Sequence, residues 1–158
     1  MTTKLLIVAY SWSGNTATMA TALQKVTGAD RIDLTVAADT FSTDMYATSD
    51  IANQQLASGN MPALTNATPD LAQYQTILVG GPVWSAKVAT PVRTFLSQLS
   101  DYHGTVMPFY TDAGTPGSYE VDFDDLVTAA NVKPGIGLSS GQLASAATIL
   151  RSWWEKAK

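Results

Sequence analysis

The sequence contains no cysteine and only one histidine, His103. The absence of cysteine excludes disulfides, thiolate metal sites, iron–sulfur clusters and cysteine nucleophiles. A single histidine argues against a zinc site or a histidine-based triad, so we expect no bound metal and a surface position for His103. Any redox or transfer chemistry must then come from a bound group, and we predict no catalytic residue in the chain itself.

Charge is also scarce in this chain. Charged residues make up 14% of the 158 residues, the formal net charge is −4, and Lys and Arg form no run. This balance predicts no nucleic-acid partner. The apolar run near the start, Leu5 to Ala9, is too short for a secretion signal, and no segment approaches the roughly 18 apolar residues of a membrane span. We therefore expect a cytoplasmic protein that makes no contact with membranes. We also expect a monomer.

Hydrophobic residues make up 46% of the chain, enough for one globular domain over residues 1–158. Short apolar runs alternate with helical patterns, which predicts an α/β fold: a doubly wound five-stranded parallel sheet with helices on both faces. Pro108 is awkward inside one of these strands. The predicted strands are 4–10, 30–36, 76–80, 105–111 and 133–139, and the predicted helices are 16–26, 44–56, 91–99, one through Leu126 and Ala130, and 145–156.

Three turn-rich segments follow predicted strands. They read "SWSGNT" at 11–16, "GGPVWSAK" at 80–87 and "TDAGTPGSY" at 111–119. In open parallel sheets, ligands bind beyond the carboxyl ends of the strands, where the strand order reverses. We therefore expect these three loops to converge on one edge of the sheet and to form the binding site.

The first loop has the composition of a small anion-binding nest. It lacks the lysine of the triphosphate-binding loop, and Gly14 is its only glycine, so it does not match the dinucleotide fingerprint. Its hydroxyl and amide side chains stand beside the free N–H groups that open a helix, which favours a terminal phosphate monoester. The alternative is that Ser13 merely caps this helix, and the residues alone leave both interpretations open.

Trp84 follows the Gly-Gly-Pro segment of the second loop. An aromatic side chain at the carboxyl end of a strand is well placed to stack on a planar ring, although a tryptophan there can also pack in the core. A Gly-Gly-Pro loop is a poor anchor for a core residue, which favours the stacking role.

The motifs together resemble those of the flavodoxin family. "YSWSGNT" at 10–16 resembles the family's phosphate-binding signature, in the YSxSGNT form of bacterial flavodoxin-like proteins. "ILVGGPVWSAKVATPVRTFL" resembles the GxPxW segment with its following helix, and "FYTDAGTPGS" resembles the third flavin loop. The resemblance spans nearly the whole chain, and it implies the flavodoxin fold, the sheet order 2-1-3-4-5 and bound FMN.

Carried over residue by residue, the resemblance implies three groups of FMN contacts. The phosphate would be held by Ser11, Trp12 through its backbone, Ser13, Gly14, Asn15 and Thr16. The isoalloxazine would be bordered by Gly81, Pro82, Val83, Trp84 and Ser85, with Trp84 stacked on it. Backbone contacts to the pyrimidine edge would come from Thr111, Asp112, Ala113 and Gly114.

The resemblance implies an electron carrier that shuttles electrons through the flavin semiquinone, between a flavodoxin reductase and an electron acceptor. The chain departs from the family pattern where Ser85 and Ala86 replace a frequent second aromatic residue and a glycine, and where Asp112 replaces a serine. The alternative function is an FMN-dependent NAD(P)H:quinone or azo-type oxidoreductase. For that enzyme, the missing second aromatic residue would leave space above the ring.

Overall fold

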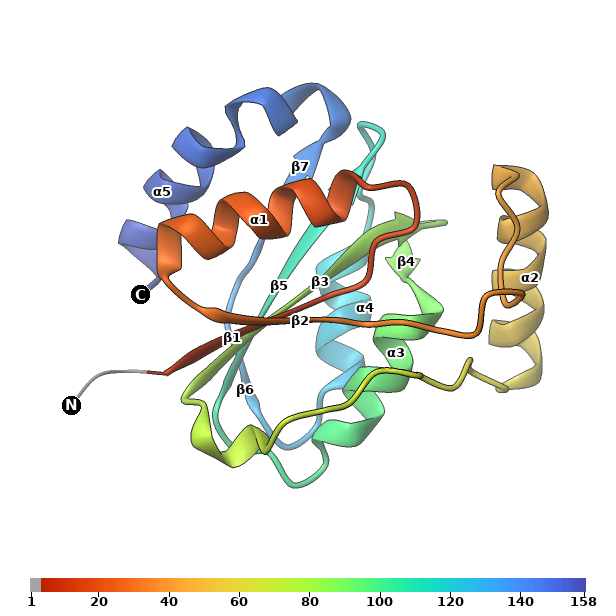
Figure 1. Ribbon diagram of the computed structural model, residues 1–158, viewed down its shortest axis with the longest axis horizontal. Coiled ribbons are helices and arrows are strands. Elements are labelled where there is room, and N and C mark those ends of the chain that lie inside the picture. The colour runs from red at the N-terminus through yellow and green to blue at the C-terminus, as the bar shows by residue number, and fades with distance from the viewer. Residues whose placement is uncertain (1–3) are drawn as a thin grey trace.

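The computed structural model describes residues 4–158, which form a central sheet between two layers of helices (Figure 1). The sheet has the order β2-β1-β3-β5-β6, with every neighbouring pair parallel, and β7 also pairs with β5. This confirms the predicted order 2-1-3-4-5, with β6 and β7 together in the fifth place. The strands are β1 (Leu5–Ala9), β2 (Asp30–Asp33), β3 (Thr76–Trp84), β4 (Lys87–Val88), β5 (Thr105–Asp112), β6 (Asn131–Val132) and β7 (Ile136–Ser139).

The fifth strand is divided in two opposite Pro108. β6 pairs with β5 as far as Val106, and β7 pairs with β5 from Phe109 onward. Proline has no N–H to donate to a neighbouring strand. At Gly135, between the two pieces, an added Cβ would lie 1.8 Å from the carbonyl oxygen of Pro108. Pairing with β5 is interrupted there, so only the later part of the predicted strand 133–139 belongs to β7.

β3 continues through Trp84, beyond the predicted strand over 76–80. The Gly-Gly-Pro segment, which we predicted as part of a loop after this strand, instead continues the strand and pairs with β5 in parallel register. Packing explains the first glycine, since a Cβ at Gly80 would lie 2.1 Å from the ring of Phe109. β3 then turns back into β4 through Ser85 and Ala86, whose φ angles are 53° and 62°.

The second strand is shorter than its predicted range of 30–36. β2 ends at Asp33, and the chain beyond it forms a single antiparallel bridge between Val36 and Leu64. The predicted helices are present with shifted ends, but the prediction that the fourth continues through Ala130 is wrong, because α4 ends at Leu126. They are α1 (Asn15–Thr27), α2 (Met45–Ser58), α3 (Thr90–Leu96), α4 (Tyr119–Leu126) and α5 (Ala146–Ala157), with short 3-10 turns η1 (Leu71–Gln73), η2 (Ser97–Leu99) and η3 (Ser140–Ser145).

The hydrophobic core has two halves, one on each face of the sheet. α1 and α5 cover one face, and α3 and α4 cover the other (Figure 1). Successive residues of a strand point to opposite faces, so the buried apolar runs serve both halves. Val8 belongs to the same buried cluster as Phe95 of α3, whereas its neighbour Ile7 belongs to the cluster that contains Leu23 of α1 and Leu150 of α5. No helix in residues 4–158 is long and apolar enough to cross a membrane.

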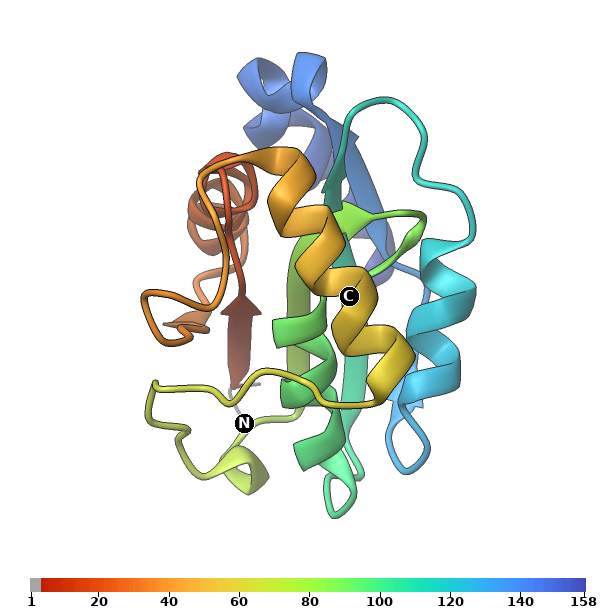
Figure 2. The ribbon, with the colours of Figure 1, turned by 90° about the vertical axis from the view of Figure 1, so that its right-hand side faces the viewer.

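α2 lies apart from the sheet. Figure 2 shows it crossing in front of α3, beside the turn that joins β3 to β4. The helix starts at a capped end, where the Ala47 N–H donates to Asp44 Oδ2 at 2.8 Å, and it ends at Gly59 in the left-handed conformation. This position brings the first turns of α2 to the edge of the sheet where the predicted loops lie.

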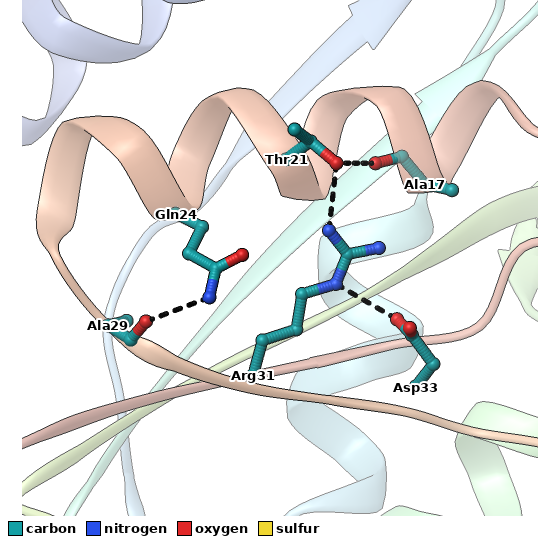
Figure 3. A network of polar contacts seen from close by, with 6 residues as sticks. All are labelled: Ala17, Thr21, Gln24, Ala29, Arg31 and Asp33. Carbon is teal, nitrogen blue, oxygen red and sulfur yellow. Dashed lines mark hydrogen bonds and ion pairs between the residues drawn. The ribbon is translucent and has the colours of Figure 1, made fainter.

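A polar network fastens the edge strand β2 to α1 (Figure 3). The Arg31 guanidinium donates to Thr21 of α1 at 2.9 Å and to Asp33 of its own strand at 3.0 Å. Gln24 donates to the carbonyl of Ala29 at 3.3 Å, across the turn between helix and strand. These contacts help to fix the orientation of α1. The predicted phosphate loop, residues 11–16, leads into the N-terminal end of this helix.

Candidate functional site

The structure brings the three predicted loops together at the carboxyl edge of the sheet. The first and third loops meet where the hydroxyls of Thr16 and Thr111 form a hydrogen bond of 2.7 Å. The second and third loops meet at Ala86 and Gly117, where a Cβ added to Gly117 would lie 2.7 Å from the Ala86 Cβ. Gly117 also has a φ of 60°, a backbone conformation that suits glycine.

The start of α1 is open to an anion. Gly14 is the N-cap residue, with a φ of 101°, and no side chain in the described residues 4–158 caps the helix. The alternative interpretation, in which Ser13 is the cap, is therefore wrong. The Ser11 hydroxyl accepts the Gly14 N–H at 3.1 Å, while Ser13 and Asn15 are exposed. The first N–H groups of α1 therefore have no side-chain cap within residues 4–158, and the exposed side chains of Ser13 and Asn15 belong to the same loop, an arrangement that attracts anions.

The side chain of Thr16 is almost fully buried. Thr16 is 1% exposed and Thr111 is 4% exposed, so each hydroxyl has its partner inside the protein. Beyond this pair the third loop holds its own shape, because the Asp112 carboxylate accepts the Gly114 N–H at 2.6 Å. Ala113 and Gly114 are exposed at the tip of the loop.

Trp84 is partly buried and packs edge-on against two other aromatic rings. Its ring centroid lies 5.9 Å from that of Tyr10 and 5.2 Å from that of Phe41, with steep interplanar angles. Burial raises the pKa of the Tyr10 hydroxyl to about 12, so this residue stays neutral beside the site. The indole is thus anchored by the core on one side and is free to contact a ligand on another.

A cavity of about 260 Å³ adjoins Trp84 and Trp12. Val83 and Ser85 line it too, whereas no residue of the 111–114 segment does. Its far wall is α2, which our sequence analysis did not assign to the site. The one sequence feature that hints at this wall is the pair of large hydrophobic residues Met45 and Tyr46, which the structure leaves 64% and 80% exposed. Residues from α2 and α3 complete the lining: Met45, Tyr46, Thr48, Ser49, Ala52, Asn53, Leu56, Val88 and Thr90.

Other chemically attractive residues do not join this site. His103 is exposed next to the start of β5, at the opposite end of the strand from Thr111. Glu120 holds structure, because it accepts the Tyr110 hydroxyl at 2.6 Å and the Gly135 N–H at 2.8 Å. Within residues 4–158 no three His, Asp or Glu side chains gather as a metal site would require.

Comparison with known proteins places the chain in a family. The family model described as "Flavodoxin" matches residues 4–157. The crystal structure of a flavoprotein in complex with FMN from Lactobacillus acidophilus is 34% identical, with a TM-score of 0.82 over 92% of this chain and 99% of that one. The apo form of the flavoprotein from the same organism is 35% identical, with a TM-score of 0.70 over 93% and 99%.

More distant structures share the fold alone. A flavodoxin from the domain Archaea is 16% identical, with a TM-score of 0.53 over 96% of this chain and 97% of that one. No protein with a curated description matches the sequence. The match of the family model over nearly the whole chain decides the assignment. This protein belongs to the flavodoxin family.

Proposed function

We propose that this protein binds FMN at the carboxyl edge of the sheet and carries electrons between two protein partners, a reductase and an electron acceptor. The observation that carries the proposal is the uncapped start of α1, which the Thr16–Thr111 hydrogen bond joins to the third loop. Bound FMN supplies one-electron and two-electron chemistry that no side chain of this protein offers. The chain would bind and orient it.

The residues at this edge fit the two ends of FMN. The phosphate meets the open N–H groups of α1, with Ser13 and Asn15 exposed beside them and no Lys or Arg between residues 5 and 24. The ring system meets the partly buried indole of Trp84, which Tyr10 and Phe41 hold in place. The FMN complex of the 34% identical flavoprotein from Lactobacillus acidophilus supports the same choice of cofactor.

The carrier role is supported by the side chains that surround this edge. Of the residues that line the cavity beside Trp84, none is charged and none is a histidine. The nearest carboxylate of the third loop, Asp112, is engaged with the Gly114 N–H. An electron carrier needs no general acid or base from the protein, whereas most enzymes that transfer protons do.

The cofactor assignment is tested by comparing FMN with riboflavin, which lacks the phosphate. We expect FMN to bind at least tenfold more tightly, measured by quenching of flavin fluorescence. The variant Asn15→Ala should weaken FMN binding and leave riboflavin binding unchanged. Asn131→Ala is the matched control, because Asn131 is exposed in β6 and far along the sheet from α1's start. Equal affinities for the two flavins would contradict the phosphate assignment.

The oxidoreductase remains as a second candidate because of Ser85. This residue is exposed, and it leaves the turn after Trp84 without a second aromatic cover. One assay distinguishes the two functions: it measures NADPH oxidation by the FMN-loaded protein. A carrier should turn over only when a separate reductase is added, and an enzyme should oxidise NADPH alone in the presence of a quinone.

A further inference from the structure

We propose that Arg93 and Asp122 are positioning residues for the ring end of the flavin site. Their ion pair holds the β3–β4 hairpin, and through it the Trp84 indole, at the place proposed for the flavin ring. Figure 1 shows β4 beside α4, which carries Asp122, and the chain leads from β4 directly into α3, which carries Arg93. The inference rests on the proposed binding of FMN and adds two residues that lie outside the binding loops.

Both polar backbone groups of Val88 are bound by this ion pair. The Val88 N–H donates to Asp122 Oδ2 at 2.9 Å, and the Val88 carbonyl accepts from Arg93 Nε at 2.9 Å. The Arg93 guanidinium also donates directly to the same Asp122 oxygen. One residue of β4 is thereby fixed to α3 through Arg93 and to α4 through Asp122.

The hairpin depends on this ion pair because its own strand pairing is short. The antiparallel register of β4 with β3 consists of two residue pairs, Val83 with Val88 and Trp84 with Lys87. A two-stranded hairpin has little stability of its own. Val88 is 1% exposed, so removal of the carboxylate would leave its N–H buried without a partner. The Arg93 and Asp122 side chains are 13% and 22% exposed, and their partial burial strengthens the attraction between them.

The ion pair reaches Trp84 through the tight turn at the hairpin tip. Lys87, the neighbour of Val88, is the strand partner of Trp84, and only Ser85 and Ala86 separate the two partners. A turn this short transmits a displacement of β4 to the end of β3. The position of the Trp84 backbone, and with it that of the indole, therefore depends on how firmly Val88 is held.

Arg93 and Asp122 act through the hairpin, because neither residue lines the cavity beside Trp84, whereas Val88 does. Their ion pair also joins the two loops proposed to contact the flavin ring. The third loop leads into α4, so the bond from Asp122 to Val88 connects the hairpin to the helix that follows this loop. Supporting contacts of this kind fix the geometry of a binding site without touching the ligand.

The experiment measures the fluorescence that bound FMN retains when the protein is saturated with it. An indole stacked on a flavin ring quenches the fluorescence of that ring, so a displaced Trp84 leaves the bound flavin brighter. We expect Asp122→Ala to raise this residual fluorescence severalfold and to weaken FMN and riboflavin binding by the same factor, because the phosphate end is unchanged. Asp122→Asn keeps an oxygen that can accept the Val88 N–H and should show a smaller change. Asp33→Ala is the matched control, because Asp33 pairs with Arg31 at 3.0 Å on the edge strand β2 and lines no part of the cavity.

A double-variant cycle distinguishes positioning of Trp84 from a general loss of stability. Every variant is measured at a temperature at which circular dichroism shows that it is folded. Trp84→Phe removes the indole and should raise the residual fluorescence by itself. Addition of Asp122→Ala to Trp84→Phe should then produce little further rise, because the group that Asp122 positions is already gone.

Three results would overturn the proposal. They are an unchanged residual fluorescence in Asp122→Ala, an equal rise in Asp33→Ala, and a full further rise when Asp122→Ala is added to Trp84→Phe. If Asp122→Ala fails to fold, Arg93→Lys replaces it. Lysine keeps the positive charge but lacks the rigid guanidinium fork that bonds the Val88 carbonyl and the carboxylate together, so the same rise is expected.

A second measurement tests the inference on protein without flavin, so failure of the cofactor assignment is distinguishable from failure of this one. The protein is labelled with fluorotryptophan, and the fluorine NMR signal of Trp84 is assigned by its loss in Trp84→Phe. We expect this signal to shift in Asp122→Ala and to keep its position in Asp33→Ala. An unmoved signal in Asp122→Ala would overturn the proposal whether or not the protein binds FMN.

Discussion

The hydrogen bond between Thr16 and Thr111 allows a direct test of how the first and third loops are joined. The two hydroxyl oxygens are 2.7 Å apart, and the residues are 1% and 4% exposed. Replacement of either residue by valine keeps its shape and leaves the other hydroxyl buried without a partner. We expect Thr16→Val and Thr111→Val each to reduce the free energy of unfolding by about 1.5 kcal/mol, the penalty of an unpaired buried hydroxyl.

The double variant should cost much less than the two single variants together. With both hydroxyls gone no polar group is stranded, and two methyl groups meet in their place. We expect a loss of about 1 kcal/mol, which gives a coupling energy of about 2 kcal/mol between the two sites. Urea unfolding of the flavin-free protein measures all four stabilities, and the m-value should stay constant across them. Additive losses would refute the hydrogen bond.

The same variants separate a structural role of Thr16 from contact with the FMN phosphate. A hydroxyl can accept one hydrogen bond and donate another, so Thr16 can accept from Thr111 and still donate to a phosphate oxygen. We then expect Thr16→Val to weaken FMN binding about tenfold relative to riboflavin, as loss of a charge-assisted hydrogen bond does, and Thr111→Val to leave that ratio unchanged. An equal change of the ratio in both variants would refute the phosphate contact.

Three further predictions concern stability and are checked by denaturant unfolding. Ala86→Gly should raise the free energy of unfolding by roughly 0.5–1 kcal/mol, because a φ of 62° strains any residue with a Cβ, and an unchanged value would contradict this strain. Tyr119→Phe should raise it by about 1 kcal/mol, because the buried Tyr119 hydroxyl has no hydrogen-bond partner within residues 4–158, and a loss of stability would reveal a hidden partner. The free energy of unfolding should fall as pH rises from 10 to 12. Burial raises the pKa values of Tyr10 and Tyr102 to about 12 in the folded protein, whereas tyrosines of the unfolded chain ionise near pH 10. A constant urea midpoint between pH 9 and 11.5 would contradict these two raised pKa values.

The parallel sheet with helices on both faces could be predicted from the sequence because each buried strand is a short apolar run with a helix after it. Its strand order came from the resemblance to the flavodoxin family. Two departures from the predicted strands, at Pro108 and at Gly80, arise from contacts between residues that are distant in the sequence. Pro108 divides the fifth strand, and the sequence indicated only that this proline was awkward. Gly80 looked like the start of a loop, whereas it is a strand residue whose missing Cβ makes room for the ring of Phe109. No local pattern reveals which distant side chain a glycine must accommodate.

The candidate site was predictable in part for a similar reason. The loops could be located because hydroxyl, amide and glycine residues gather directly after apolar strands, and the structure does bring Thr16 beside Thr111. The wall formed by α2 could not be located, since its contribution depends on where the helix lies rather than on what it contains. The exposed pair Met45 and Tyr46 is the one local sign of it, in a segment that otherwise reads as a polar surface helix.

The turn at Ser85 and Ala86 connects these findings. Two-residue hairpin turns with positive φ at both positions strongly favour Asn-Gly or similar pairs. This chain instead has Ser85 and Ala86, and the positive φ strains the backbone of both residues. The strained turn touches the third loop through Gly117 and lines the α2 cavity through Ser85. Glycine at both positions would relieve the strain, but it would also remove the Ala86 Cβ that lies beside Gly117 and the Ser85 side chain that lines the cavity. The strain is therefore best explained by the two contacts that this turn makes at once, one on each side of the hairpin.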